Sequence, residues 1–150
     1  LAAAKQIQNE SSRAQALTAI ASKLPPELLP EALAAAKQIQ NESSRAQALT
    51  AIASKLPPEL LPEALAAAKQ IQNEGYRAEV LKVLAIPLSK IPTDQLYSYW
   101  EKTLDELSLR DRRNLLTDIE KLVPVIFALG NNAAIASISC SIQKVARWWH

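Results

Sequence analysis

"LPPELLPEALAAAKQIQNESSRAQALTAIASK", residues 24–55, defines the architecture of the chain, because its pattern recurs over residues 1–74. Residues 1–42 and residues 33–74 are identical, which sets a period of 32 residues. A fixed period between 20 and 50 residues is typical of arrays in which one small unit stacks on the next. Because the identity extends to polar positions, it indicates recent duplication or deliberate consensus design, and neither requires a separate role for each copy.

Two amphipathic helices make up each unit, since apolar residues recur at helical spacing in two stretches. The apolar face of the first helix consists of Leu61, Ala64, Leu65, Ala68 and Ile71. The apolar face of the second helix consists of Ala46, Leu49, Ile52, Ala53 and Leu56. Strand-like alternation is absent and β-branched residues are sparse, so we expect an all-α fold.

Short polar and proline-rich segments separate these helices. In the segment 41–44, we expect Asn41 to end the first helix in a left-handed conformation and serine to cap the second. The segment 56–58 should end the second helix, because proline disfavours helix in the residue before it. Pro62 fits the first turn of the next helix, where its missing N–H costs little. Each unit is therefore predicted to be a helix hairpin, and at least three stacked hairpins are needed to bury a continuous core.

The third unit diverges after residue 74. Pro87 should end its second helix early, and a further helix is predicted near Asp94–Leu107. Ser108, with Asp111 three positions later, resembles the start of the following helix. Pro124 should bend or break that helix.

The last part of the chain contains a strong stop signal. Gly130 is a good helix end, and Asn132 can cap a final helix at Ala133–Trp148. We therefore predict a right-handed α-α superhelix, a solenoid of helix hairpins, as one continuous domain. Residues 1–96 form its repeats and residues 97–150 form a helical cap at the C-terminal end.

Composition excludes several classes of function. The net charge is +2, and residues 1–74 carry equal numbers of basic and acidic side chains, so neither a nucleic acid nor a membrane surface is an expected partner. No apolar run approaches the length of a membrane-spanning helix. The two glycines exclude a glycine-rich phosphate loop. A single histidine and a single cysteine exclude histidine-based catalysis and a zinc site, so we expect no enzyme activity, no cofactor and no metal.

The repeat resembles a known family. Residues 24–49, "LPPELLPEALAAAKQIQNESSRAQAL", are similar to the 32-residue α-helical repeats of large cyanobacterial signalling proteins, which are related to tetratricopeptide repeats. Residues 124–149, "PVIFALGNNAAIASISCSIQKVARWW", resemble the cap that closes such arrays. In that family the arrays often lie downstream of NACHT- or NB-ARC-type STAND nucleotidase modules, and the resemblance implies a sensor or scaffold role. No nucleotide-binding motif is present, so it implies no ATPase site here.

Two sets of repeated polar residues are the candidate sites. Arg13, Arg45 and Arg77 recur at the margin of the apolar stripe, where each either links helices or forms part of a ligand-binding ladder. A second set lies opposite the core on the first helices and forms rows across stacked copies, either as a binding surface or as a plain solvated face. Its members are Glu31, Glu63, Gln6, Gln38, Gln70, Lys37, Lys69, Asn41 and Asn73.

Three further features carry expectations about packing. Trp148 and Trp149 cover the last core layer or form an exposed aromatic patch, and we favour the cover. Cys140 should be a buried small hydrophobic residue. The first repeat lacks a preceding neighbour, so we expect an apolar face there that pairs two chains as a homodimer. Its members are Leu1, Ala4, Ile7, Leu17 and Ile20.

The favoured function is a non-catalytic repeat scaffold that binds a protein or senses a ligand, as a fragment of a larger signalling protein. A lone cysteine fits a reducing compartment, so a cytoplasmic location is expected. A purely structural spacer, or an engineered consensus repeat without a ligand, is the alternative. RNA binding by one helix per base is a weaker alternative, because neutral and identical repeats offer no code.

Overall fold

The computed structural model describes the backbone of residues 1–148 and the side chains of residues 1–143. Helices and turns make up this described part, which contains no strand, so the predicted all-α class is confirmed. The α-helices are α1 (Ala2–Lys5), α2 (Glu10–Ala21), α3 (Leu29–Lys37), α4 (Glu42–Ala53), α5 (Leu61–Lys69), α6 (Glu74–Leu88), α7 (Thr93–Ser108), α8 (Arg112–Lys121) and α9 (Val123–Trp148). Two short 3-10 helices, η1 (Pro26–Leu28) and η2 (Pro58–Leu60), precede α3 and α5.

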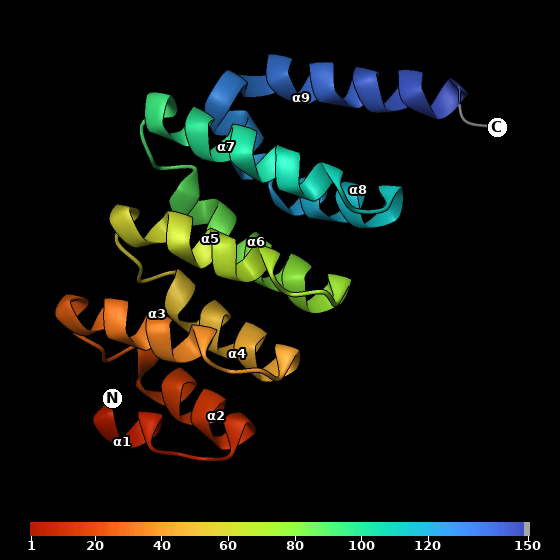
Figure 1. Cartoon of the computed structure of the whole chain (residues 1–150). Helices are drawn as coiled ribbons and strands as arrows, with labels where there is room; N and C mark the ends of the chain where they lie inside the picture. Colours follow the sequence, from red (N-terminus) through yellow and green to blue (C-terminus); the bar gives the residue numbers. More distant parts are fainter. Residues whose placement is uncertain (149–150) are drawn as a thin grey trace.

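The helices are arranged as successive pairs that lie one above the other (Figure 1). Within a repeat the first helix packs on the second, as α3 does on α4 and α5 on α6. Between repeats the second helices α2, α4, α6 and α8 pack directly on one another. The first helices of the repeats contact one another much less, so the row of second helices holds neighbouring repeats together.

The loop between the two helices of a repeat is built on asparagine, in a way that differs from our expectation. Asn41 is extended, with φ −64° and ψ 117°, and its side chain accepts a hydrogen bond from Ser44 N at 2.9 Å. Asn73 caps α6 in the same manner, through Tyr76 N. The predicted left-handed closure by Asn41 and capping by serine are therefore wrong, because the asparagine carboxamide already satisfies a free N–H of the first turn.

Prolines organise the connections between repeats as the sequence predicts. Pro57 is extended, and residues 58–60 form the short turn η2 before α5 begins at Leu61. Pro62 lies in the first turn of α5. This turn requires no hydrogen bond from the proline nitrogen, so the residue fixes the backbone without loss.

The divergent region keeps the pairing but changes the helix ends. Helix α6 runs through Pro87 to Leu88 and is longer than its copies, so the predicted early end is wrong. Helix α7 confirms the predicted helix near Asp94–Leu107. Asp111, rather than Ser108, caps α8 by accepting from Asn114 N at 2.9 Å. The helix is interrupted at Leu122, between α8 and α9, as expected near Pro124.

Helix α9 is interrupted at the predicted stop. Gly130 (φ −158°, ψ 22°) and Asn131 (φ 57°, ψ −155°) are not helical. Positive φ in this ψ range is rare for residues other than glycine, so the backbone at Asn131 is strained. We call residues 123–129 the first segment of α9 and residues 132–148 its second segment.

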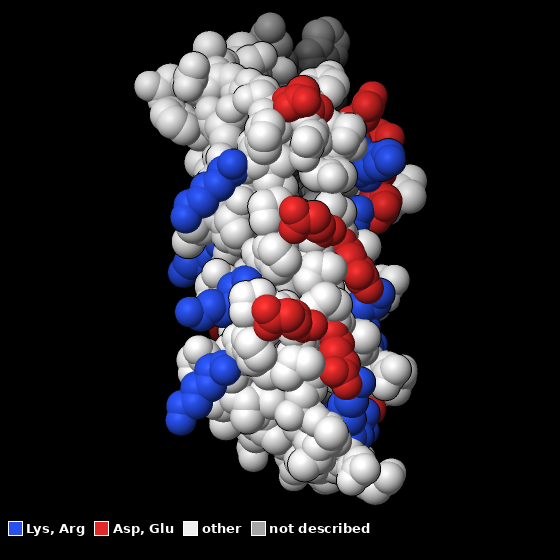
Figure 2. All heavy atoms as spheres, turned by 90° about the vertical axis from the view of Figure 1, so that its left-hand side faces the viewer, with Lys and Arg blue, Asp and Glu red and all other residues white. Residues whose placement is uncertain are grey.

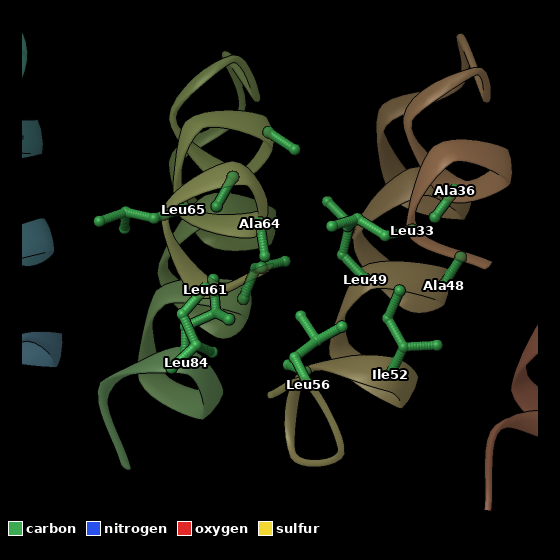
Figure 3. Packing of buried hydrophobic residues seen from close by; sticks show 14 of the residues in the cluster. Leu33, Ala36, Ala48, Leu49, Ile52, Leu56, Leu61, Ala64, Leu65 and Leu84 are labelled. Atoms are coloured by element: carbon green, nitrogen blue, oxygen red, sulfur yellow. The ribbon is translucent and has the colours of Figure 1, made fainter. Parts of the chain in front are cut away.

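The core consists of leucine, isoleucine and alanine from every repeat. The apolar side chains that the sequence predicts to be buried are at most 5% exposed: Leu33, Ile39, Leu49, Ile52, Leu65, Ile71 and Leu81. Figure 3 shows Leu33 and Leu49 on the side of the α3–α4 pair that faces α5 and α6, and Leu65 on the opposite side of α5, away from α3 and α4. Each buried leucine or isoleucine stabilises the fold by roughly 1.5–3 kcal/mol, and the small alanines let the helices approach closely.

Candidate functional site

The predicted row on the first helices is partly occupied by contacts within the chain. Lys37 Nζ lies 2.6 Å from Glu63 Oε1, and the identical Lys5–Glu31 pair is 2.5 Å apart. Lys69 continues this series with Glu106 at 2.8 Å. Figure 2 shows the result on one face, with a column of acidic side chains between two columns of basic side chains. Such exposed pairs contribute about 0–1 kcal/mol each, so they align repeats more than they stabilise them.

The other members of this row divide into two groups. Asn41 and Asn73 cap α4 and α6, so their side-chain oxygens are engaged. The glutamines Gln6, Gln38 and Gln70 are exposed at the ends of the first helices. Within the row, the glutamines are therefore the side chains most available to an outside molecule.

A carboxylate links each repeat to the next loop, and the sequence analysis missed it. Glu42 accepts hydrogen bonds from Gln72 N at 2.7 Å and from Asn73 N at 3.0 Å. Glu10 does the same with Gln40 N and Asn41 N. These backbone hydrogen bonds lower the pKa of both carboxyls below its usual value, against a smaller opposing effect of burial. The repetition of glutamate directly after the capping asparagine was the available signal.

The repeated arginines donate to backbone carbonyls at the end of the preceding helix. Arg13 Nε reaches Ile7 O at 3.0 Å, and Arg45 Nη1 reaches Ile39 O at 3.3 Å. Both side chains are only half-buried. This geometry favours a structural role over a ligand-binding ladder at these two positions.

Arg77 has a different environment from its two copies. Its side chain is fully buried, and its Nε lies 2.7 Å from Asp118 Oδ2 on α8. Its Nη1 donates to Ile71 O and Gln72 O, both at 2.9 Å. Burial raises the pKa of the Asp118 carboxyl, while the hydrogen bond and charge of Arg77 oppose that rise. Arg77 thus joins the third repeat to the region that we predict to be the cap.

A groove on the row of second helices is a further candidate site, again missed from the sequence. It has a volume of about 370 Å³ and lies mainly over α4 and α6, with one residue from α2. Its lining is Thr18, Ser43, Ala46, Gln47, Thr50, Ala51, Tyr76 and Glu79. Thr50 Oγ1 is buried without a hydrogen-bond partner among the described residues, and Tyr76 is 39% exposed. The groove therefore offers uncharged hydrogen-bonding groups beside an aromatic ring.

Near the two ends of the chain, the burial of several residues differs from our expectations. Cys140 is exposed, so the prediction of a buried small hydrophobic residue is wrong. At the first repeat Ala4 and Leu17 are buried and the other predicted members of the apolar face are half-buried, because α1 packs on α2 and α2 packs on α4. The apolar face is therefore smaller than predicted. The side chains of Trp148 and Trp149 lie outside the described residues.

One stretch of α9 is longer and more apolar than the sequence analysis expected. Val123–Gln143 is long and apolar enough to cross a membrane by length and composition alone. The expectation that no run approaches this length overlooked it because alanine, serine and asparagine interrupt the larger apolar residues. Only 11% of this window is buried, which distinguishes it from the core helix of a soluble protein.

The comparisons with known proteins add no identity. No family model, characterised protein or solved structure matches the chain. Within the described residues no group of three or more histidine, cysteine, aspartate or glutamate side chains is placed to hold a metal ion. The class of the protein therefore rests on its helix pairs and its repeated surfaces.

Proposed function

We propose that the chain is a right-handed α-solenoid with a C-terminal cap, and that it acts as a non-catalytic scaffold that binds an extended protein segment. The observation that carries this proposal is the groove over α4 and α6, which combines Gln47, Thr50 and Tyr76. Repeat proteins bind partners along surfaces to which successive repeats contribute equivalent side chains. A role within a larger cytoplasmic signalling protein is part of the same proposal, and it rests on the resemblance of the repeats.

The chemistry of the groove favours a peptide backbone as ligand. Gln47 is exposed and presents both a donor and an acceptor, and the exposed Ser43 presents a hydroxyl. Tyr76 adds an amphipathic surface, a feature enriched at protein interfaces. Glu79 is the charged residue of the lining, so it would favour a segment with a basic side chain nearby.

A peptide-display selection against the whole chain tests the proposal. We expect enriched peptides whose binding weakens at least about fivefold in Gln47→Ala and Tyr76→Ala variants, since loss of one good contact costs about 1 kcal/mol or more. Gln38→Ala and Gln70→Ala on the first helices are matched controls. If instead the controls abolish binding, the partner uses the first-helix row, and the groove is not the site.

A structural spacer is the second candidate, and one observation favours it. The lysines and glutamates of the first helices pair with each other between repeats, as in Lys37–Glu63, rather than standing free. A spacer would enrich no peptide over an unrelated repeat protein of the same charge. That outcome would contradict the scaffold proposal.

A further inference from the structure

The chain contains an uncharged segment that is unlike the rest of its surface. No charged residue occurs from position 122 to position 143, and no acidic residue follows Glu120. Elsewhere the charged residues occur throughout the helices, at 21% of the whole sequence. The segment is followed by Lys144, Arg147 and two tryptophans. Solvated protein surfaces normally carry many charges, so an exposed stretch without any indicates a different environment.

Large apolar side chains of this region reach the surface. Phe127 is 47% exposed and Val123 is 38% exposed, both in the first segment of α9. Ile135, Ile138 and Ile142 follow i, i+3, i+7 spacing in the second segment and are half-buried. These isoleucines line an open groove of about 190 Å³. The other residues of that groove are Leu116, Ile119, Glu120, Val123, Ile126 and Ser139.

The opposite side of the second segment carries small uncharged residues. Ser137, Cys140 and Ser141 are exposed there. A helix with isoleucine on one face and serine or alanine on the other is amphipathic without being strongly hydrated. One class of amphipathic helix lies in the plane of a membrane interface, where binding depends on the apolar area that enters the bilayer and on the lipid composition.

The geometry distinguishes a surface helix from one that spans the bilayer. Helix Val123–Gln143 would extend roughly 31 Å if straight, which matches the hydrocarbon core. However, Leu122, Val125 and Ile126 are buried against the preceding helices, and the backbone breaks at Gly130 and Asn131. In the second segment only the 12 residues 132–143 precede the first charged residue, and their roughly 18 Å of helix is too short to span.

We propose that the second segment of α9, with the exposed apolar residues of the first segment, binds the surface of a bilayer that contains anionic lipids. Ile135, Ile138 and Ile142 enter the headgroup and acyl boundary, and the break at Asn131 allows the segment to tilt away from α8. The positive charges of Lys144 and Arg147 complement the lipid headgroups. Tryptophan is enriched at membrane interfaces, and the sequence has Trp148 and Trp149 directly after Arg147.

Charge is the reason to choose a lipid surface rather than a second copy of the chain. The chain has no acidic residue after Glu120, so α9 of a second copy would offer Lys144 and Arg147 no partner of opposite charge. Anionic headgroups attract each such cation with about 1 kcal/mol near the membrane surface. This inference is independent of peptide binding in the groove over α4 and α6, so either proposal can fail alone.

Vesicle flotation with the whole chain tests the inference. We expect it to float with phosphatidylcholine vesicles that contain phosphatidylglycerol, and to float weakly with phosphatidylcholine alone. High salt should reduce flotation, since the attraction is electrostatic. Lys144→Gln with Arg147→Gln should weaken partitioning about 30-fold. The matched control, Lys23→Gln with Lys55→Gln, removes the same charge from exposed lysines of the repeats and should change partitioning far less.

A second variant tests the apolar contact. Ile138→Ser with Ile142→Ser should weaken partitioning at least tenfold, because both variants remove apolar surface that enters the acyl boundary. Ile86→Ser, at a side chain of α6 that is 59% exposed, is its control. Absence of flotation for the unaltered chain on either vesicle would overturn the inference. A dimer in sedimentation equilibrium that the isoleucine variant dissociates would also overturn it, because a second copy would then cover this face.

Discussion

The contact between Arg77 and Asp118 supplies the sharpest test of how the repeats join the C-terminal region. Asp118→Ala would remove the carboxylate that accepts from Arg77 Nε at 2.7 Å and 3.0 Å, and it would leave the guanidinium fully buried. The remaining acceptors are Ile71 O, Gln72 O and Asn114 Oδ1. Hydrogen bonds to a charged group are worth about 1.5–3 kcal/mol each. Removing one partner of a buried ion pair costs about 3–5 kcal/mol, which agrees with the loss of one or two such hydrogen bonds.

Urea unfolding followed by circular dichroism measures this cost. We expect the free energy of unfolding to fall by about 3 kcal/mol or more in Asp118→Ala, which would lower the melting temperature by roughly 6–12 °C for a chain of this size. Replacing both partners by apolar residues, as Arg77→Met with Asp118→Leu, should recover most of the loss, since no charge then stays buried alone.

The identical repeats supply a matched control for this experiment. Arg45 occupies the same place in the preceding unit but its side chain is 13% exposed rather than fully buried, with a 3.3 Å hydrogen bond to Ile39 O and a 3.7 Å contact with Glu42. Arg45→Ala should therefore cost only about 1 kcal/mol. Equal losses for Asp118→Ala and Arg45→Ala, or a loss below about 1 kcal/mol for Asp118→Ala, would show that the buried ion pair does not join the repeats to the C-terminal region.

Three further predictions concern single residues. The pKa of the Glu42 carboxyl is lowered in the folded chain. Its contribution to stability is therefore present above the pKa of the unfolded chain and is lost as the pH falls through the pKa of the folded chain. Glu42→Gln should flatten that part of the stability–pH curve in urea titrations. Asn41→Ala removes the cap on Ser44 N and should lower the free energy of unfolding by about 1 kcal/mol, whereas Asn41→Ser should largely retain it. Cys140 is exposed, so a thiol reagent should modify it without denaturant, and strong protection would contradict its placement.

Much of the local structure could be predicted because it depends on short-range chemistry. The spacing of Leu61, Leu65 and Ile71 defines a helical face wherever the stretch occurs. Proline at position 57 and position 62 fixes the connection through its own ring. The helix cap was assigned to the wrong residue because Asn41 and Ser44 are both good caps, and only the backbone conformation distinguishes them.

The candidate sites were less predictable, because they depend on residues distant in the sequence. The groove over α4 and α6 requires Thr18, Gln47 and Tyr76 to meet across three repeats. The exposure of Cys140 depends on where the second segment of α9 lies after the break at Asn131. A helical wheel places such a residue on a face, but it does not say whether another element covers that face.

The three repeated arginines have the same local position but different surroundings. The period of 32 residues places Arg13, Arg45 and Arg77 at the same position, the fourth residue of a second helix, because similar stretches have similar local preferences. It could not determine that Arg77 alone is fully buried. That difference arises because α8 brings Asp118 to Arg77 from 41 positions away, whereas the copies of this arginine face a neighbouring repeat. Local sequence sets the helix, and the neighbour packed against it sets the burial, the charge partner and the energy.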